Sequence, residues 1–187
     1  MSRKIHINRI ISIILLGPAM EIVASYLLDK ILLFFPETAA KYSEMIMQMT
    51  ELTSLTVFYV VVMAPIFEEI IFRLLIMGGI NKLLPFIFAN IIQALLFGIY
   101  HLNVVQGIYA FILGLYIGYI KKIFGNIVYC MLFHMSLNLS GLFVEKILGS
   151  QNEILLSICF VFSTIAVVAI MYKVIKEEEN VRLVDCK

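Results

Sequence analysis

The stretch Pro65-Ile-Phe-Glu68-Glu69-Ile-Ile-Phe-Arg73 places three charged side chains inside an apolar run that extends from about residue 52 to about residue 80. A charged residue near the middle of a membrane helix costs roughly 2.5–3.5 kcal/mol on scales derived from membrane insertion. Such residues therefore face a bundle interior or a watered cavity, and they usually mark a working site. This run predicts a membrane helix that carries functional groups.

Helical spacing separates these charged side chains into two kinds. Glu69 and Arg73 are four residues apart with the acid first, which is the favourable order for an intrahelical ion pair. Glu68 lies about 100° round the helix, and this spacing predicts that it has no partner. A carboxylate in a poorly solvated setting is suited to act as a general base. We therefore expect Glu69 and Arg73 to form a supporting pair and Glu68 to be the candidate base.

The composition is typical of an integral membrane protein. The chain has 187 residues, of which 62% are hydrophobic and 14% charged, whereas soluble proteins average about 45–50% apolar and about 25% charged residues. The net charge of +1 gives no indication of nucleic-acid binding. Cys130, Cys159 and Cys186 lack metal-type spacing, and we expect no disulfide. We expect one membrane domain over residues 1–187, because several spans would consume most of the chain.

Apolar runs and their polar breaks predict an all-α, polytopic transmembrane bundle of about six helices with an intramembrane polar site. The first run is longer than the apolar region of a signal peptide and no small-x-small cleavage site follows it, so we interpret it as a span. The long polar connection over 29–51 includes Met45, Met47 and Met49, and a short interfacial helix is expected there. The six predicted spans are about 10–28, 52–80, 84–103, 104–120, 123–144 and 153–172.

The distribution of basic residues predicts that both termini are cytoplasmic. Ten lysines and arginines fall on the side of the termini, and three fall on the opposite side. The tail over 173–187 is expected to be a solvated cytoplasmic end. The ten are Arg3, Lys4, Arg9, Lys82, Lys121, Lys122, Lys173, Lys176, Arg182 and Lys187, and the three are Lys30, Lys41 and Lys146.

Two of the three histidines lie in the apolar runs, and four-residue spacing recurs around both. Phe97 precedes His101 by one turn, and Asn138 follows His134 by one turn, so each pair shares a helix face. With the Glu68 stretch, three predicted helices each carry a polar stripe. Inside a membrane, these stripes can avoid lipid only by contacting one another or water, so we expect them to converge.

Each polar residue also has a purely structural interpretation. A single buried histidine is usually a satisfied core residue, and an isolated Glu–Arg pair is more often structural than catalytic. Glu21, beside Pro18, is either structural or lines an entrance, and we favour the structural role. One acid without an intrahelical partner together with two histidines on separate spans is hard to explain by packing. Helix contacts or caps account for Asn90, Gln93, Asn126, Gly114 and Gly118.

Together these motifs resemble the CPBP family, which comprises the CAAX proteases and bacteriocin-processing proteins and is also called the Abi family. The resemblance covers about 52–142 and implies an all-helical intramembrane endopeptidase with a membrane-associated peptide substrate. It implies a catalytic carboxylate at Glu68, a supporting pair at Glu69 and Arg73, and further site positions at His101, His134 and Asn138. The motifs that carry it are Glu68-Glu69-x-x-x-Arg73, Phe97-x-x-x-His101 and His134-x-x-x-Asn138.

The family has been described both as metalloproteases and as metal-independent glutamate proteases. Glu68, His101 and His134 could supply the three protein ligands of a zinc site, but the water-activating acid would then have to be another residue. The Glu69 carboxylate is best explained by Arg73, and no H-E-x-x-H helix is present. We therefore favour a metal-free mechanism in which Glu68 activates water, while zinc stays an open alternative.

Two other classes of function stay open. A proton-coupled carrier also uses Glu, Arg and His inside membranes, although no inverted repeat is evident in the sequence. An inactive family member that binds a partner helix, as an immunity or scaffold protein, would be free to lose motif residues that this chain keeps. Eukaryotic members of the family trim prenylated CAAX tails, and bacterial ones are linked to peptide maturation and bacteriocin immunity. The small size favours a bacterial type of role.

Overall fold

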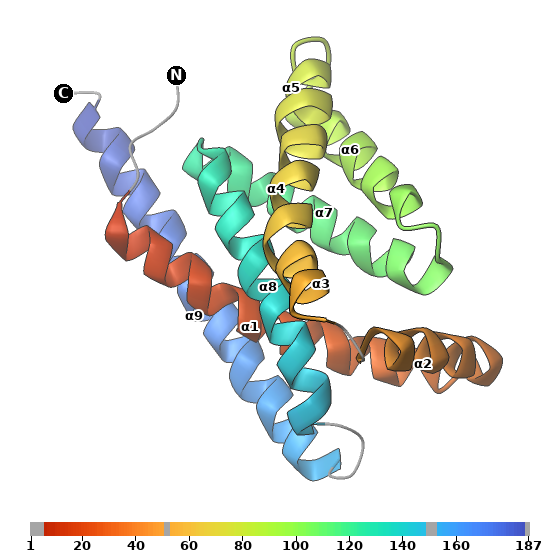
Figure 1. The fold of residues 1–187 in the computed structure, drawn as a ribbon. Coiled ribbons are helices and arrows are strands. Elements are labelled where there is room, and N and C mark those ends of the chain that lie inside the picture. The colour runs from red at the N-terminus through yellow and green to blue at the C-terminus, as the bar shows by residue number, and fades with distance from the viewer. Residues whose placement is uncertain (1–5, 51–52, 149–152, 186–187) are drawn as a thin grey trace. The chain divides into compact units, whose positions relative to one another are not determined.

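The computed structural model describes residues 6–50, 53–148 and 153–185 (Figure 1). These residues form helices joined by short turns and no strands, which confirms the all-α prediction. The chain divides into two compact units, one over 24–118 and the other over 1–23 with 119–187. The helices α1 and α7 each contribute to both units.

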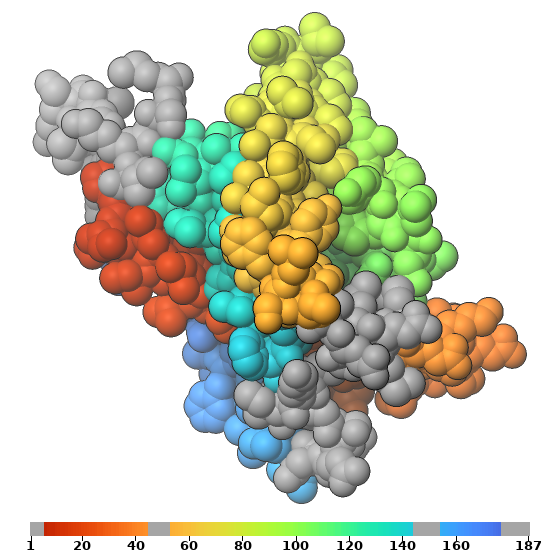
Figure 2. Space-filling model, viewed as in Figure 1, coloured from red at the N-terminus to blue at the C-terminus, as the bar shows by residue number. Residues whose placement is uncertain are grey.

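The unit over 24–118 contains a long helical run, a preceding polar helix and a helical hairpin. The run over 54–80 is continuous but changes between α and π hydrogen bonding. In the space-filling view, its upper part lies directly beside α6, against which η2 and α5 pack (Figure 2). The elements are α2 (Pro36–Thr50), α3 (Ser54–Phe58), η1 (Tyr59–Met63), α4 (Ala64–Glu69), η2 (Ile70–Ile76), α5 (Met77–Ile80), α6 (Phe86–Tyr100) and α7 (Val104–Phe124).

Two π-helical turns flank the Glu68-Glu69 dipeptide. The first, η1, ends just before Pro65, which is buried in α4. A proline inside a helix donates no N–H and its ring presses on the carbonyl four residues earlier, here that of Val61. The wider π turn relieves this crowding within a continuous helix. The second turn, η2, contains Arg73. Because π turns inside α-helices occur frequently at functional sites, their position here agrees with the sequence interpretation.

Close backbone contact holds α6 and α7 together as a hairpin. A Cβ atom added to Gly98 would lie 2.6 Å from the carbonyl oxygen of Gly107, and one added to Gly118 would lie 1.8 Å from Asn90 Oδ1. The Gln93 amide donates to the Gly114 carbonyl at 2.8 Å, and the Asn90 amide donates to the Leu115 carbonyl at 3.0 Å. These contacts confirm the predicted helix-to-helix roles of Asn90, Gln93, Gly114 and Gly118.

The unit over 1–23 and 119–187 contains most of α1 (Ile7–Leu32), α8 (Ile127–Leu148) and α9 (Glu153–Asp185). The α1–α8 contact is explained by Pro18, which cannot donate to the carbonyl of Ile14 four residues earlier. Ser136 Oγ on α8 donates to that carbonyl at 2.7 Å. A Cβ on Gly17 would lie 2.6 Å from the same Oγ, so a glycine is needed for this approach.

The turn between α7 and α8 has clear local causes. Gly125 has a φ of 66°, a left-handed conformation that a glycine adopts without strain. Asn126 Oδ1 accepts from the Val128 N–H at 3.0 Å and so caps the start of α8. This confirms the capping role that was predicted for Asn126.

The predicted spans correspond to observed helices, with differences in length. Within the part of the chain that the structure describes, three segments are long and apolar enough to cross a membrane by length and composition: α1, α7 and Ile154–Lys176 within α9. The apolar helices Phe86–Tyr100 and Ile127–Phe143 are shorter. The last helix was predicted to end near residue 172, but it continues to Asp185 because the lysines and glutamates that follow are good helix formers.

The connection over 29–51 forms the expected short helix, α2, which starts at Pro36 and has Glu37 in its first turn. A proline at the first helical position and an acid in the first turn both favour a helix start. With the run over 54–80 counted once, the described residues form seven helical runs, and α2 is the one added to the six predicted spans. Its location at a membrane interface stays a prediction.

Candidate active site

The predicted ion pair is present at the junction of α4 and η2. Arg73 Nη1 lies 3.1 Å from Glu69 Oε1, and both side chains are completely buried. Two opposite charges that are both withdrawn from solvent stabilise each other, whereas either one alone would be strongly destabilising. The pair therefore fixes the helical turn that carries Glu68.

Phe97 connects this pair to the first histidine. The Arg73 guanidinium lies 4.4 Å from the centre of the Phe97 ring, a cation–π contact. The edge-to-face contact between the Phe97 and His101 rings spans 4.9 Å, and that between Phe72 and Phe97 spans 5.0 Å. Phe97 is 2% exposed. The second motif is thus packed directly against the first within one unit.

His101 lies at the end of α6 and not within a longer helix. The helix ends at Tyr100, and Leu102 adopts a φ of 54° before α7 begins at Val104. Asn103 Oδ1 accepts from the Val105 and Gln106 N–H groups at 3.0 and 3.1 Å, so it starts a new helix. The predicted extension of this span to residue 103 is therefore wrong. The histidine occupies a turn, where its ring is half-buried.

A hydrogen bond fixes the protonation of one nitrogen of this histidine. His101 Nδ1 lies 2.8 Å from the Phe97 carbonyl oxygen. A carbonyl oxygen can only accept, so Nδ1 must carry the hydrogen. Nε2 is then a lone-pair acceptor in the neutral ring and a donor only in the imidazolium form. This geometry decides which chemistry each protonation state of His101 can perform.

Glu68 interacts with a residue that its position on the helix did not indicate. Its side chain is half-buried, and it interacts electrostatically with Tyr100, which also interacts with Tyr59. The expectation that Glu68 has no partner is therefore wrong, because Tyr100 approaches it from outside its own helical turn. Tyr100 also contacts the His101 ring, with 5.8 Å between the ring centres. Tyr100 immediately precedes His101 in the chain but belongs to none of the three motifs.

The third motif lies on α8, in the other unit. His134 is 6% exposed and Asn138 is half-buried, one turn further along the same helix face. Thus Glu68, Glu69, Arg73 and His101 belong to the unit over 24–118, and the third-motif residues belong to the unit that includes 119–187. The convergence of all three stripes stays a prediction.

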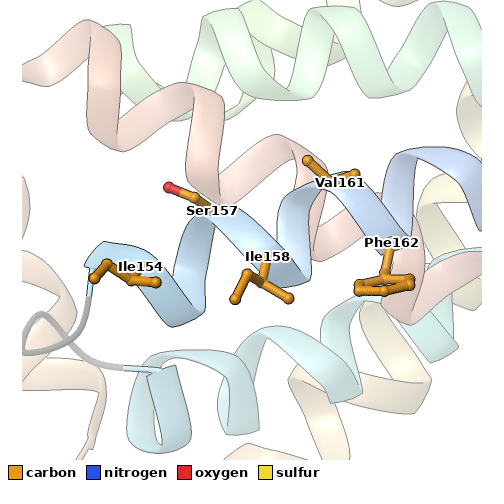
Figure 3. A pocket seen from close by; sticks show the side chains of 5 residues that line it. All are labelled: Ile154, Ser157, Ile158, Val161 and Phe162. Carbon is orange, nitrogen blue, oxygen red and sulfur yellow. The ribbon is translucent and has the colours of Figure 1, made fainter.

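Among the residues that the structure describes, no three His, Cys, Asp or Glu side chains gather into a group that could hold a metal ion. Glu68 and His101 belong to one unit and His134 to the other, so a zinc site formed by these three residues stays a prediction. An apolar surface hollow on α9 is formed by that helix alone (Figure 3), so it contains no motif residue. Its lining residues are Ile154, Ser157, Ile158, Val161 and Phe162.

Comparison with known proteins supports the resemblance on independent grounds. A family model described as type II CAAX prenyl endopeptidase Rce1-like matches residues 50–140, a segment that includes all three motifs. Searches of curated proteins and of solved structures found no match. The family implies protease activity, and the apolar helices are those of an integral membrane protein. The segment over 50–140 therefore belongs to the Rce1-like family of CAAX-type intramembrane endopeptidases, within the CPBP group.

Proposed function

We propose that the protein is an intramembrane endopeptidase that hydrolyses a peptide bond in a membrane-associated or amphipathic peptide. The observation that carries this proposal is the family match over a segment in which the first two motifs form one packed unit. There, a fully buried ion pair is covered by an aromatic ring that also contacts the histidine. Charged side chains inside a membrane cost free energy and usually mark a functional site, which supports the proposal.

In the proposed reaction, Glu68 is the general base. Its carboxylate takes a proton from a water molecule, the water oxygen attacks the scissile carbonyl carbon, and the same proton is later available for the leaving amine. Its half-buried position allows both water and substrate to reach it. Glu69 cannot share this role easily, because its carboxyl group is completely buried against Arg73.

The negative charge that develops on the carbonyl oxygen requires hydrogen-bond donors. We assign this role to His101, His134 and Asn138. Since His101 Nδ1 donates to the Phe97 carbonyl, its contribution to the oxyanion must come from Nε2–H of the imidazolium form. Asn138 can contribute an amide N–H without any change of protonation. The contact between Phe97 and the His101 ring fixes the ring plane, and therefore the direction of Nε2.

The same hydrogen bond is the specific observation that favours the second candidate, a zinc-dependent protease. Histidines that bind metals almost always donate their other ring N–H to a carboxylate or carbonyl, as His101 does. Glu68, His101 and His134 would hold the ion, which would supply an acidified water and polarise the carbonyl. Glu69 would still support the turn, and no other acid in the motifs is left for the base. We therefore keep the metal-free mechanism as the proposal.

The cellular setting is part of the proposal. We infer a bacterial cell membrane with both termini in the cytoplasm, from the ten basic residues on one side against three on the other. We also propose a role in peptide or bacteriocin maturation, or in self-immunity.

The experiment is cleavage of a peptide library by protein purified in detergent, with the products identified by mass spectrometry. We expect cleavage at defined peptide bonds by the wild type and none by Glu68→Ala. Prenylated and unmodified versions of each peptide separate the two substrate classes. If the wild type and Glu68→Ala give the same products, the activity belongs to a contaminant and the proposal is wrong.

A further inference from the structure

Glu21 is a buried acid that the proposed mechanism does not yet use. It lies on α1, outside the matched segment over 50–140, and only 8% of its surface is exposed. An acid inside an apolar span costs free energy and is retained where it has a partner or a task. The sequence alone favoured a structural role for it. Its surroundings in the structure indicate a more specific one.

The α1–α8 contact places the Glu21 carboxyl group beside Gly141 of α8. A Cβ atom added to Gly141 would lie 3.2 Å from Glu21 Oε1 and 3.6 Å from Cδ. The carboxyl group therefore lies directly over Gly141, in space that any side chain would occupy. The approach is fixed by Ser136 Oγ, which bonds to the Ile14 carbonyl about two turns away. All of these residues belong to the same unit.

Gly141 continues the stripe of the third motif. It follows Asn138 by three residues and His134 by seven, and such positions share one face of a helix. Neighbours at this spacing have Cβ atoms about 5–6 Å apart. A carboxyl group placed over Gly141 is therefore within reach of the Asn138 side-chain amide.

We propose that Glu21 is a positioning residue for Asn138. Its carboxyl oxygen accepts one N–H of the Asn138 amide, which orients the second N–H toward the carbonyl oxygen of the scissile bond. This inference rests on the proposed protease function and adds a residue from α1 to its site. An amide without such an acceptor would rotate among several orientations, and the oxyanion contact would be lost for part of the time.

The first test compares Glu21→Met with Glu21→Gln in peptide cleavage by the full-length protein. Glu21→Met removes the acceptor, and we expect kcat to fall by about 10–100-fold with KM little changed. An effect of this size is typical when a residue that orients a metal-binding side chain is lost. Glu21→Gln keeps an acceptor oxygen and should retain most of the activity. Ser12→Ala is the matched control, because Ser12 is equally buried on α1 but bonds only to the Asn8 carbonyl of its own helix.

The second test asks whether Glu21 acts through Asn138. In an Asn138→Ala background, Glu21→Met should cause no further loss of kcat, because the group that it orients is gone. If Glu21→Met does not fold, Gly141→Ala takes its place, because the added methyl group displaces the Glu21 carboxyl group without removing it. Gly141→Ala should then lower kcat in the wild-type background and not in the Asn138→Ala background. Unchanged kcat in Glu21→Met, or losses that multiply with those of Asn138→Ala, would overturn the inference.

Failure of the proposed function gives a different result. If wild-type protein cleaves no peptide, the protease proposal fails and the coupling is measured by thermal unfolding instead. The melting-temperature losses of Glu21→Met and Asn138→Ala should then combine to less than their sum, because contacting residues are not additive. Additive losses would show that the two side chains do not interact, whatever the protein's activity.

Discussion

The buried pair of Glu69 and Arg73 makes the sharpest prediction about stability. Both side chains are completely buried and 3.1 Å apart, so the change of either one leaves an uncompensated charge. Removal of one partner of such a pair typically costs about 3–5 kcal/mol. At about 2–4 °C per kcal/mol for a chain of this size, Glu69→Gln or Arg73→Met should lower the melting temperature by roughly 6–20 °C.

The double variant distinguishes a pair from two independent buried residues. Replacement of both charges strands neither, so Glu69→Gln with Arg73→Met should be more stable than the worse single variant. Arg73→Met should be the worse one, because it also loses the cation–π contact with Phe97, worth about 0.5–2 kcal/mol.

The assay is thermal unfolding in detergent, followed by the helical circular dichroism signal. The exposed residues Glu44 and Lys82 supply matched controls, since Glu44→Gln and Lys82→Met make the same chemical changes without burial. Both controls should unfold close to the wild type. If the double variant is no more stable than the less stable single variant, Glu69 and Arg73 are not partners. If the single variants are as stable as the controls, a buried unpaired charge does not cost the free energy expected here.

Three further predictions follow from the helix contacts, the histidine chemistry and the charge distribution. Gly118→Ala should destabilise the protein, because its Cβ would lie 1.8 Å from Asn90 Oδ1, whereas Gly79→Ala meets nothing within 4 Å and should be neutral in the same unfolding assay. Purified protein should contain much less than one zinc per chain, and prolonged chelation should leave cleavage intact; stoichiometric zinc with activity that is lost on chelation and restored by zinc would overturn the metal-free mechanism. At either terminus, a fused reporter that works only in the cytoplasm should be active, and one that works only in the periplasm should be inactive. Activity of the periplasmic reporter at either end would contradict the predicted orientation.

The sequence was sufficient to predict the elements whose causes are local. The apolar runs gave the spans, and four-residue spacing gave the pair Glu69–Arg73, which the structure confirms. The cap at Asn126 and the close approach at Gly118 also follow from the chemistry of single residues. Each of these predictions needs only helical geometry and the cost of leaving a polar group without a partner.

The features that the sequence did not predict depend on contacts between helices. The π turns around Glu68 cannot be recognised from the spacing of apolar residues. Each of them adds about one residue to a single helical turn, which changes that spacing too little to be noticed. The end of α6 before His101 is set by the competing cap at Asn103. The position of Glu21 over Gly141 requires knowing that Ser136 bonds to the carbonyl that Pro18 leaves open, more than a hundred residues away along the chain.

The central claim is that Glu68 performs the chemistry of peptide hydrolysis. Its most direct test is the rate of cleavage by Glu68→Gln, which keeps the shape of the side chain but cannot take up a proton from water. Glu44→Gln is the matched control on an exposed acid. General-base catalysis is worth about 10²–10⁴-fold, so we expect at least a hundredfold loss of rate with an unchanged melting temperature. A Glu68→Gln protein that keeps more than about a tenth of the wild-type rate would contradict the claim.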